Sequence, residues 1–154
     1  MHGLEAIEYQ VATNAGTRLM PLAKVASGGE LSRISLALQV AISQVASVPT
    51  LIFDEVDVGI GGRVAEVVGK KLKALGQRYQ VLCVTHLAQV ASCGDQHWQV
   101  SKQNRRGAVS SQIQVLEPEA RVAEIARMLG GTAITEATLQ HAAEMLALNS
   151  VSEA

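Results

Sequence analysis

Two stretches decide the fold of this chain: Lys24–Arg33, KVASGGELSR, and Thr50–Glu55, TLIFDE. The first is a loop of small residues that opens an apolar helix, and such a loop can present backbone N–H groups to a phosphate. The second is an apolar strand ending in two carboxylates, which can hold Mg²⁺ and a base that activates water. Together they predict ATP chemistry, although the phosphate-gripping motif GxxxxGK followed by Ser or Thr is absent from the sequence.

Hydrophobic periodicity around these stretches predicts an alternation of strands and helices. The expected strands are 4–13, 51–53, 81–84, 97–102 and 109–116, the last two flanking a hairpin turn at 104–107. The expected helices are 30–47, 63–75, 87–92, 119–129 and 134–148. This order predicts an α/β fold with a mostly parallel sheet, flanking helices and a terminal β-hairpin, in one partial domain covering 1–154.

The composition is apolar for a small domain. Hydrophobic residues make up 48% of the 154 residues, charged residues 18%, and the mean hydropathy is +0.20. A parallel sheet that is buried on both faces would explain this, and so would a surface that docks on something outside the chain. The missing phosphate-gripping motif favours the second explanation. The net charge of −1 gives no overall basic footprint for nucleic acid.

The cysteines and the hydropathy pattern indicate the cellular compartment of the protein. Cys83 lies in an apolar run and is expected to be a small core residue, and two thiols form no disulfide framework. The sequence shows no signal peptide and no apolar run long enough to span a bilayer. We therefore expect a reducing cytoplasm and no membrane partner.

Three groups of residues are candidates for the chemistry. Asp54 at a strand end is suited to holding Mg²⁺ through water, and Glu55 beside it to deprotonating the attacking water. His86 follows the strand at 81–85, at the same sheet edge, where an imidazole can donate to a γ-phosphate oxygen. The run Ser27–Gly29 precedes a helix N-terminus that favours an anion. Each also has an ordinary structural explanation: an acidic cap, a structural histidine, or a serine N-cap.

Several motifs of the chain resemble those of the RecN family of SMC-like DNA repair proteins, within the ABC-type ATPase heads. The segments are Ala26–Arg33 (ASGGELSR), Phe53–Gly62 (FDEVDVGIGG), Val84–Val90 (VTHLAQV), Pro21–Val25 (PLAKV) and Glu124–Gly131 (EIARMLGG). Their order matches signature motif, Walker B strand, D-loop and switch histidine, and the resemblance covers nearly the whole chain. It implies a P-loop NTPase-like head, of which this chain is the C-terminal lobe.

The resemblance also implies roles and partners. Asp54 would support Mg²⁺, Glu55 would be the base and His86 the γ-phosphate sensor. The nucleotide-binding residues implied are Ser27, Gly28, Gly29 and Glu30, toward ATP on the opposite head, and Asp57 and Gly59 in the D-loop region. The partners implied are an N-terminal lobe of the same protein, a second head in a homodimer, and DNA. Gly61 departs from the wider pattern, which usually has an aspartate there, and this favours a loop built from backbone.

Three functions follow from these observations. The first is the ATPase-head lobe of a cytoplasmic, nucleoid-associated protein of double-strand-break repair and recombination, inactive without its N-terminal lobe. The second is a non-catalytic module that dimerises or docks through its apolar face. The third, a hydrolase using Ser27, His86 and Asp54, is disfavoured because no GxSxG elbow is present.

DNA contact by this lobe is a separate hypothesis. The basic residues Lys102, Arg105 and Arg106 at the expected hairpin tip could neutralise phosphates. A solvated turn is the alternative explanation of the same cluster.

Overall fold

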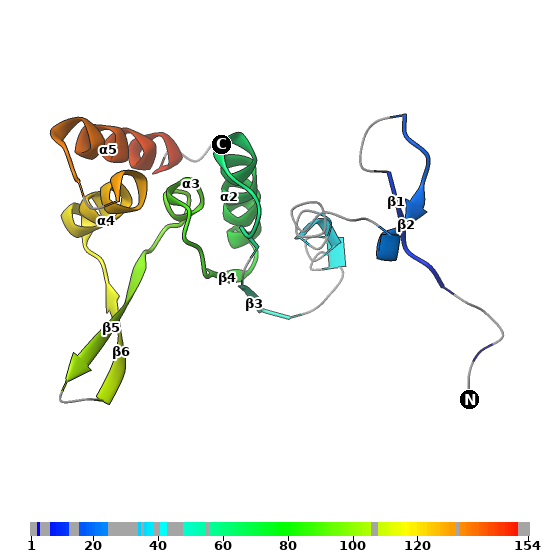
Figure 1. The fold of residues 1–154 in the computed structure, drawn as a ribbon, viewed down its shortest axis with the longest axis horizontal. Helices are drawn as coiled ribbons and strands as arrows, with labels where there is room; N and C mark the ends of the chain where they lie inside the picture. The colour runs from blue at the N-terminus through cyan, green and yellow to red at the C-terminus, as the bar shows by residue number, and fades with distance from the viewer. Residues whose placement is uncertain are drawn as a thin grey trace.

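Figure 1 shows the fold as a computed structural model of the 154-residue chain. The structure describes residues 3, 7–12, 16–24, 34, 36–38, 41–42, 48–54, 56–105, 108–131 and 133–150. The glycine loop Ser27–Glu30, the expected base Glu55 and the basic residue Arg106 lie outside these ranges, so the roles predicted for them stay predictions.

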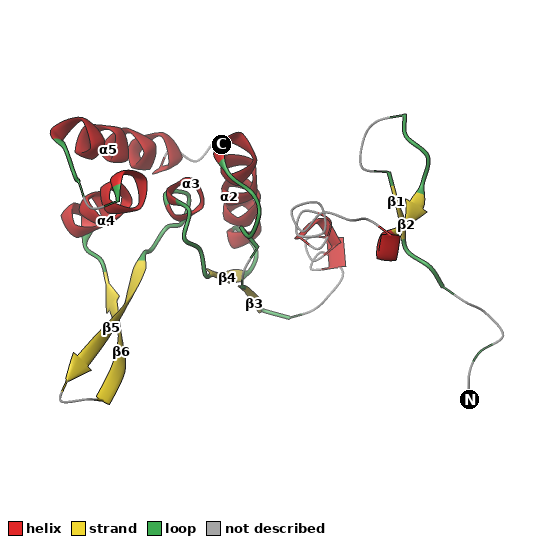
Figure 2. Cartoon of the chain, viewed as in Figure 1, coloured by secondary structure: helices red, strands yellow, loops and turns green. Residues whose placement is uncertain are grey.

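Strands and helices alternate through the middle of the chain, and two helices follow at its C-terminal end (Figure 2). The elements in chain order are β1 (Gln10–Val11), β2 (Met20–Pro21), the 3-10 helix η1 (Leu22–Lys24), β3 (Thr50–Phe53), α2 (Gly62–Gly76), β4 (Gln80–Cys83), α3 (Ala88–Ala91), β5 (Trp98–Arg105), β6 (Ala108–Val115), α4 (Pro118–Gly130) and α5 (Glu136–Ser150). Ile34, 36–38 and 41–42 are helical too, within the helix expected over 30–47. Within the described ranges, no helix has the length and apolar character needed to cross a bilayer.

The N-terminal strand is shorter than the sequence predicts. Of the described residues 7–12, only β1 is strand, and it pairs antiparallel with β2, for which no strand was predicted. Gly16 lies in the connection with a φ of +81°, a conformation that glycine adopts without steric cost. Leu22 N donates to Tyr9 O at 2.8 Å beyond the pair. Pro21 has no N–H to donate, and this limits how far the ladder can extend.

The parallel part of the fold is the pair β3–β4, in register from Thr50 opposite Gln80 to Phe53 opposite Cys83. Helix α2 packs on one face of this pair and forms the first core cluster with it. That cluster contains Leu36, Phe53, Val56, Ala65, Val68, Leu72, Leu75 and Val90. On the other face Ile52 is 71% exposed, and Val84, which follows β4, is 61% exposed. These strands are therefore buried on one face only, which argues against burial on both faces as the explanation of the apolar composition.

The hairpin β5–β6 projects away from the C-terminal helices (Figure 1). Its antiparallel register runs from Trp98 opposite Val115 to Arg105 opposite Ala108, so β5 extends into the turn predicted at 104–107 and β6 begins directly after it. Because side chains alternate along a strand, one face is mainly polar and the other carries apolar side chains. The apolar side chains with exposed positions are Trp98, Val100, Val109, Ile113 and Val115. We call these residues, together with Ile52 and Val84, the open strand faces.

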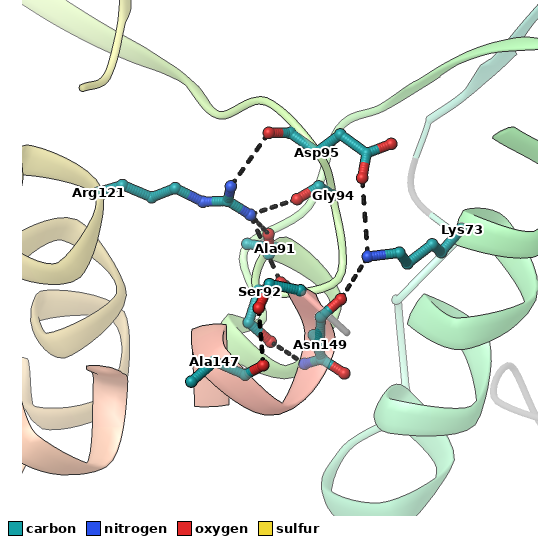
Figure 3. A network of polar contacts seen from close by, with 9 residues as sticks. Lys73, Ala91, Ser92, Gly94, Asp95, Arg121, Ala147 and Asn149 are labelled. Carbon is teal, nitrogen blue, oxygen red and sulfur yellow. Dashed lines mark hydrogen bonds and ion pairs between the residues drawn. The ribbon is translucent and has the colours of Figure 1, made fainter. Parts of the chain in front are cut away.

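Helices α2 to α5 form what we call the helical layer. A second core cluster joins α3, α4 and α5 through Ala88, Ile125, Ala126 and Ala142. A network of polar contacts also connects these helices (Figure 3). Arg121 of α4 donates to the backbone oxygens of Asp95 at 3.2 Å, Ser92 at 3.4 Å, Ala91 at 3.5 Å, and Gly94. These carbonyls close the C-terminal end of α3, which makes Arg121 a side-chain cap for that helix.

The network continues from α3 to the outer helices. Lys73 of α2 lies 3.6 Å from the Asp95 carboxylate and donates to the backbone oxygen of Asn149 in α5. Asn149 Nδ2 donates in turn to Ser92 Oγ at 3.1 Å. Burial lowers the pKa of Arg121, which remains a cation at neutral pH. The helical layer is thus held by a core and by polar contacts that are exposed or partly buried.

Candidate functional site

The carboxyl ends of β3 and β4 meet at one edge of the sheet. Phe53 and Cys83 are paired, and Val84 N donates to Phe53 O at 2.9 Å just beyond the pair. Asp54 follows β3 directly and is exposed, and His86 follows β4 by three residues. The predicted sheet edge therefore carries both residues, and ligands of open α/β sheets bind at such an edge.

Asp57 is the most enclosed charged group of this edge, with 2% of it exposed. Its Oδ2 accepts from Thr85 Oγ1 at 2.5 Å and from His86 N at 3.0 Å, and His86 Nδ1 lies 3.2 Å away. All three donors come from the segment after β4. A buried carboxylate needs such donors to offset its loss of water. The predicted D-loop residue is thus tied to the predicted switch histidine.

The turn between β3 and α2 brings Asp57 to this position. Residues 56–59 form the turn, closed by a hydrogen bond from Ile60 N to Asp57 O at 3.3 Å. Gly59 has a φ of +72°, which a residue with a side chain rarely adopts, so the loop depends on glycine there. Gly61 is extended and serves as the N-cap of α2 without a side-chain cap. An added Cβ at Gly61 would meet nothing within 4 Å, so the backbone does not exclude an aspartate there.

Cys83 at the end of β4 is not a nucleophile in this setting. Burial, and then the carboxylates of Asp57 and Asp54, raise the pKa of its thiol to about 11. The thiol therefore stays protonated at neutral pH, and nucleophilic chemistry requires the thiolate. This agrees with the expectation that Cys83 is a small core residue.

The hydrolase alternative finds little support in the geometry. It requires Asp54 to orient His86, but the carboxylate that contacts the His86 ring is that of Asp57. Ser27, its nucleophile, lies outside the described residues. Sequence reasoning missed Thr85 as a member of the site. The signal was a hydroxyl residue directly before the histidine, but its partner in the turn could not be identified from spacing.

Two of the residues predicted to contact DNA lie on the hairpin and not at this edge. Lys102 is exposed on β5, and Arg105 is the last residue of that strand. Among the described residues, no group of three or more His, Cys, Asp or Glu side chains is arranged to hold a metal ion.

Comparisons with known proteins show which sequences this chain resembles. No family model matches the sequence. The chain is 56% identical over 144 residues to the DNA repair protein RecN of Vibrio cholerae, a match that covers 94% of the chain and 26% of that protein. It is 42% identical over 144 residues to RecN of Bacillus subtilis, covering 94% of the chain and 25% of that protein. The chain thus spans about a quarter of the length of these relatives.

Solved structures support the fold. One comes from work on the ATP-driven dimerisation and DNA-stimulated activation of SMC ATPases. It superposes with a TM-score of 0.61 at 22% identity, over 77% of this chain and 71% of its own. The SMC head domain from Thermotoga maritima superposes with a TM-score of 0.51 at 30% identity, over 66% of this chain and 37% of its own. The predicted α/β, SMC-head-like fold class is confirmed, and in sequence the chain corresponds to the C-terminal part of RecN-family proteins.

Proposed function

We propose that this chain is the C-terminal lobe of a RecN-type ATPase head that acts in the repair of DNA double-strand breaks. One observation carries the proposal: Asp54 and His86 share a sheet edge in a chain that is 56% identical to a RecN protein. In the proposed cycle, ATP binding closes two heads on each other and hydrolysis opens them, which controls how the whole protein holds DNA in the cytoplasm.

Each residue of this sheet edge has its own proposed role in ATP hydrolysis. Asp54 would hold Mg²⁺ through water, and a single exposed carboxylate at a strand end fits a cation that keeps several waters and phosphate oxygens as ligands. Bound Mg²⁺ would neutralise charge on the β- and γ-phosphates. Glu55 would take the proton of the attacking water, and His86 would donate to a γ-phosphate oxygen. Ser27, Gly28, Gly29 and Glu30 would contact ATP held by the opposite head.

The open strand faces support a missing partner layer. Val100 and Ile113 face each other across the hairpin and are 65% and 67% exposed, and Trp98 and Val115 beside them are half exposed. Apolar surface of this kind marks an interaction site. RecN relatives carry about three quarters of their sequence outside the matched part. We propose that an N-terminal lobe, which would bring the phosphate-gripping loop, covers these faces.

The test uses a chimera in which this chain replaces the matching part of Vibrio cholerae RecN. The chimera should hydrolyse ATP, whereas the 154-residue chain alone should not. Glu55→Gln should lower turnover by about a hundredfold or more while leaving ATP binding intact. Glu119→Gln, at an exposed position of α4, is the matched control and should leave turnover unchanged. Turnover by the chain alone that is insensitive to Glu55→Gln would refute the site assignment.

The second candidate is the non-catalytic docking module, which the same open strand faces favour. It predicts stable homodimers of the chain and no complex with a separately made N-terminal lobe. Size measurements on the chain alone and on the mixture distinguish the two functions. A one-to-one complex with the N-terminal lobe would support the ATPase head.

A further inference from the structure

The hydrogen bonds around Asp57 and His86 determine which group donates and which accepts in the contact between them. Leu87 N donates to Thr85 Oγ1 at 3.1 Å, so this oxygen is already an acceptor. The Thr85 hydroxyl then directs its own hydrogen to Asp57 Oδ2 at 2.5 Å. His86 N adds a second hydrogen bond to the same oxygen. The carboxylate is therefore held in place by backbone and hydroxyl donors before the imidazole is considered.

The imidazole adds the third contact, Nδ1 to Oδ2 at 3.2 Å. An ionised carboxylate only accepts hydrogen bonds, so Nδ1 is the nitrogen that carries the hydrogen in this contact. The hydrogen bond made by one ring nitrogen determines which tautomer is present and how the ring is oriented. The side chain of His86 is 71% exposed, so little packing holds the ring apart from this contact.

We propose that Asp57 is a positioning residue that aims the His86 imidazole, a role that rests on the function proposed above. Asp57 holds Nδ1–H toward the protein and leaves Nε2 facing away from the carboxylate. When the ring binds a second proton, both of its nitrogens are donors, and Nε2–H then donates to a γ-phosphate oxygen. Because Asp57 belongs to the turn at 56–59 and His86 to the segment after β4, the contact also couples the two loops. If the turn at 56–59 shifts when two heads close, the imidazole ring of His86 would then rotate.

The first test reads the tautomer of His86 in the 154-residue chain by ¹⁵N NMR, with the signal assigned through His86→Gln. The neutral ring should carry its hydrogen on Nδ1. In Asp57→Asn the ring should move toward the Nε2-protonated form that free histidine prefers. Asp95→Asn, which removes a carboxylate that is 75% exposed, should leave the signal unchanged. A wild-type ring protonated on Nε2 would overturn the proposal without any variant.

The second test is a double-mutant cycle on ATP turnover by the chimera. Asp57→Asn should lower kcat by about tenfold with KM changed less than about twofold, because ground-state binding is kept. If Asp57 acts through His86, adding Asp57→Asn to His86→Gln should change kcat by less than about twofold. An equal loss in both backgrounds would show a structural role and overturn the proposal. If the unmutated chimera lacks turnover, the proposed function fails, and the tautomer measurement still decides whether Asp57 positions His86.

Discussion

The helical layer and the open strand faces differ in how far this chain completes its own packing. In the helical layer, Ile125, Ala126 and Ala142 are fully buried, and Arg121 finds carbonyl partners inside the fold. On the strand side, Ile52 and hairpin residues such as Val100 and Ile113 keep large apolar side chains in solvent. The helices bury their apolar stripes on one another, but a two-stranded sheet with a helix on one face needs a further layer for the other.

This difference separates stability from assembly. Residues of the helical layer should determine whether the lobe folds, and residues of the open strand faces should determine what the lobe binds. The same substitution made once in each region tests directly whether the helical layer controls folding and the open strand faces control binding.

The largest expected effect comes from truncating isoleucine in the two regions. Ile125→Ala in α4 should lower the free energy of unfolding by about 2–5 kcal/mol, because it leaves a cavity in a closed core. Ile52→Ala removes the same atoms from an exposed site and should change it by less than about 0.5 kcal/mol. Urea unfolding of the chain alone measures both values.

The same pair distinguishes folding from docking. Ile52→Ala should weaken binding to the N-terminal lobe, measured by calorimetry, although it leaves the isolated chain stable. A loss of several kcal/mol for Ile52→Ala in the chain alone would mean that its face is already covered in solution, for example by a second copy. The comparison between the regions would then be wrong.

A close helix contact gives a smaller effect. A Cβ added at Gly69 of α2 would lie 2.7 Å from Cys93 Sγ and 3.0 Å from the backbone oxygen of Gln89. Gly69→Ala should therefore push α2 away from α3 and cost about 1–3 kcal/mol of stability. Gly76→Ala, at the exposed end of the same helix with nothing within 4 Å, is the control and should be neutral or slightly stabilising. Thermal unfolding compares the two variants. Equal melting temperatures would show that α2 and α3 can move apart without loss of stability.

The sequence predicts the regular elements well, because local periodicity encodes them. Helix α2 was expected at 63–75 and occupies Gly62–Gly76, and β3 and β4 lie within a residue of their expected positions. The contact of Asp57 with Thr85 was not predictable, since it depends on a turn that folds back across 28 positions of sequence. Which strand residues stay exposed was not predictable for a different reason. Periodicity identifies an apolar strand but does not say whether its own chain supplies both covering layers.

The smallest effect concerns Glu124 of α4, which joins the helical layer to the polar face of the hairpin. Its carboxylate accepts from Arg127 Nε at 2.8 Å and Nη2 at 2.7 Å, and from Gln99 Nε2 of β5 at 2.7 Å. Glu124→Gln keeps one acceptor oxygen but loses the charge, so it should cost about 1 kcal/mol at neutral pH. Glu66→Gln is the control, because Glu66 pairs with Lys70 on the surface and its loss should not be measurable.

The pH dependence of this loss identifies its cause. The hydrogen bonds from Arg127 lower the pKa of Glu124 from 4.5, so the folded state keeps the carboxylate ionised where the unfolded chain has begun to bind a proton. The stabilisation is therefore complete above pH 4.5 and disappears as the pH falls through the lowered pKa. Burial lowers the pKa of His97 from 6.5, and the Glu124 carboxylate partly opposes this shift, so protonation of His97 costs wild type less than Glu124→Gln. The gap in unfolding free energy between wild type and Glu124→Gln should therefore hold or grow slightly below pH 6.5, and narrow as the pH falls through the lowered pKa of Glu124. A difference in unfolding free energy that does not depend on pH would mean that packing, and not the charge of Glu124, stabilises the contact between the hairpin and the helices.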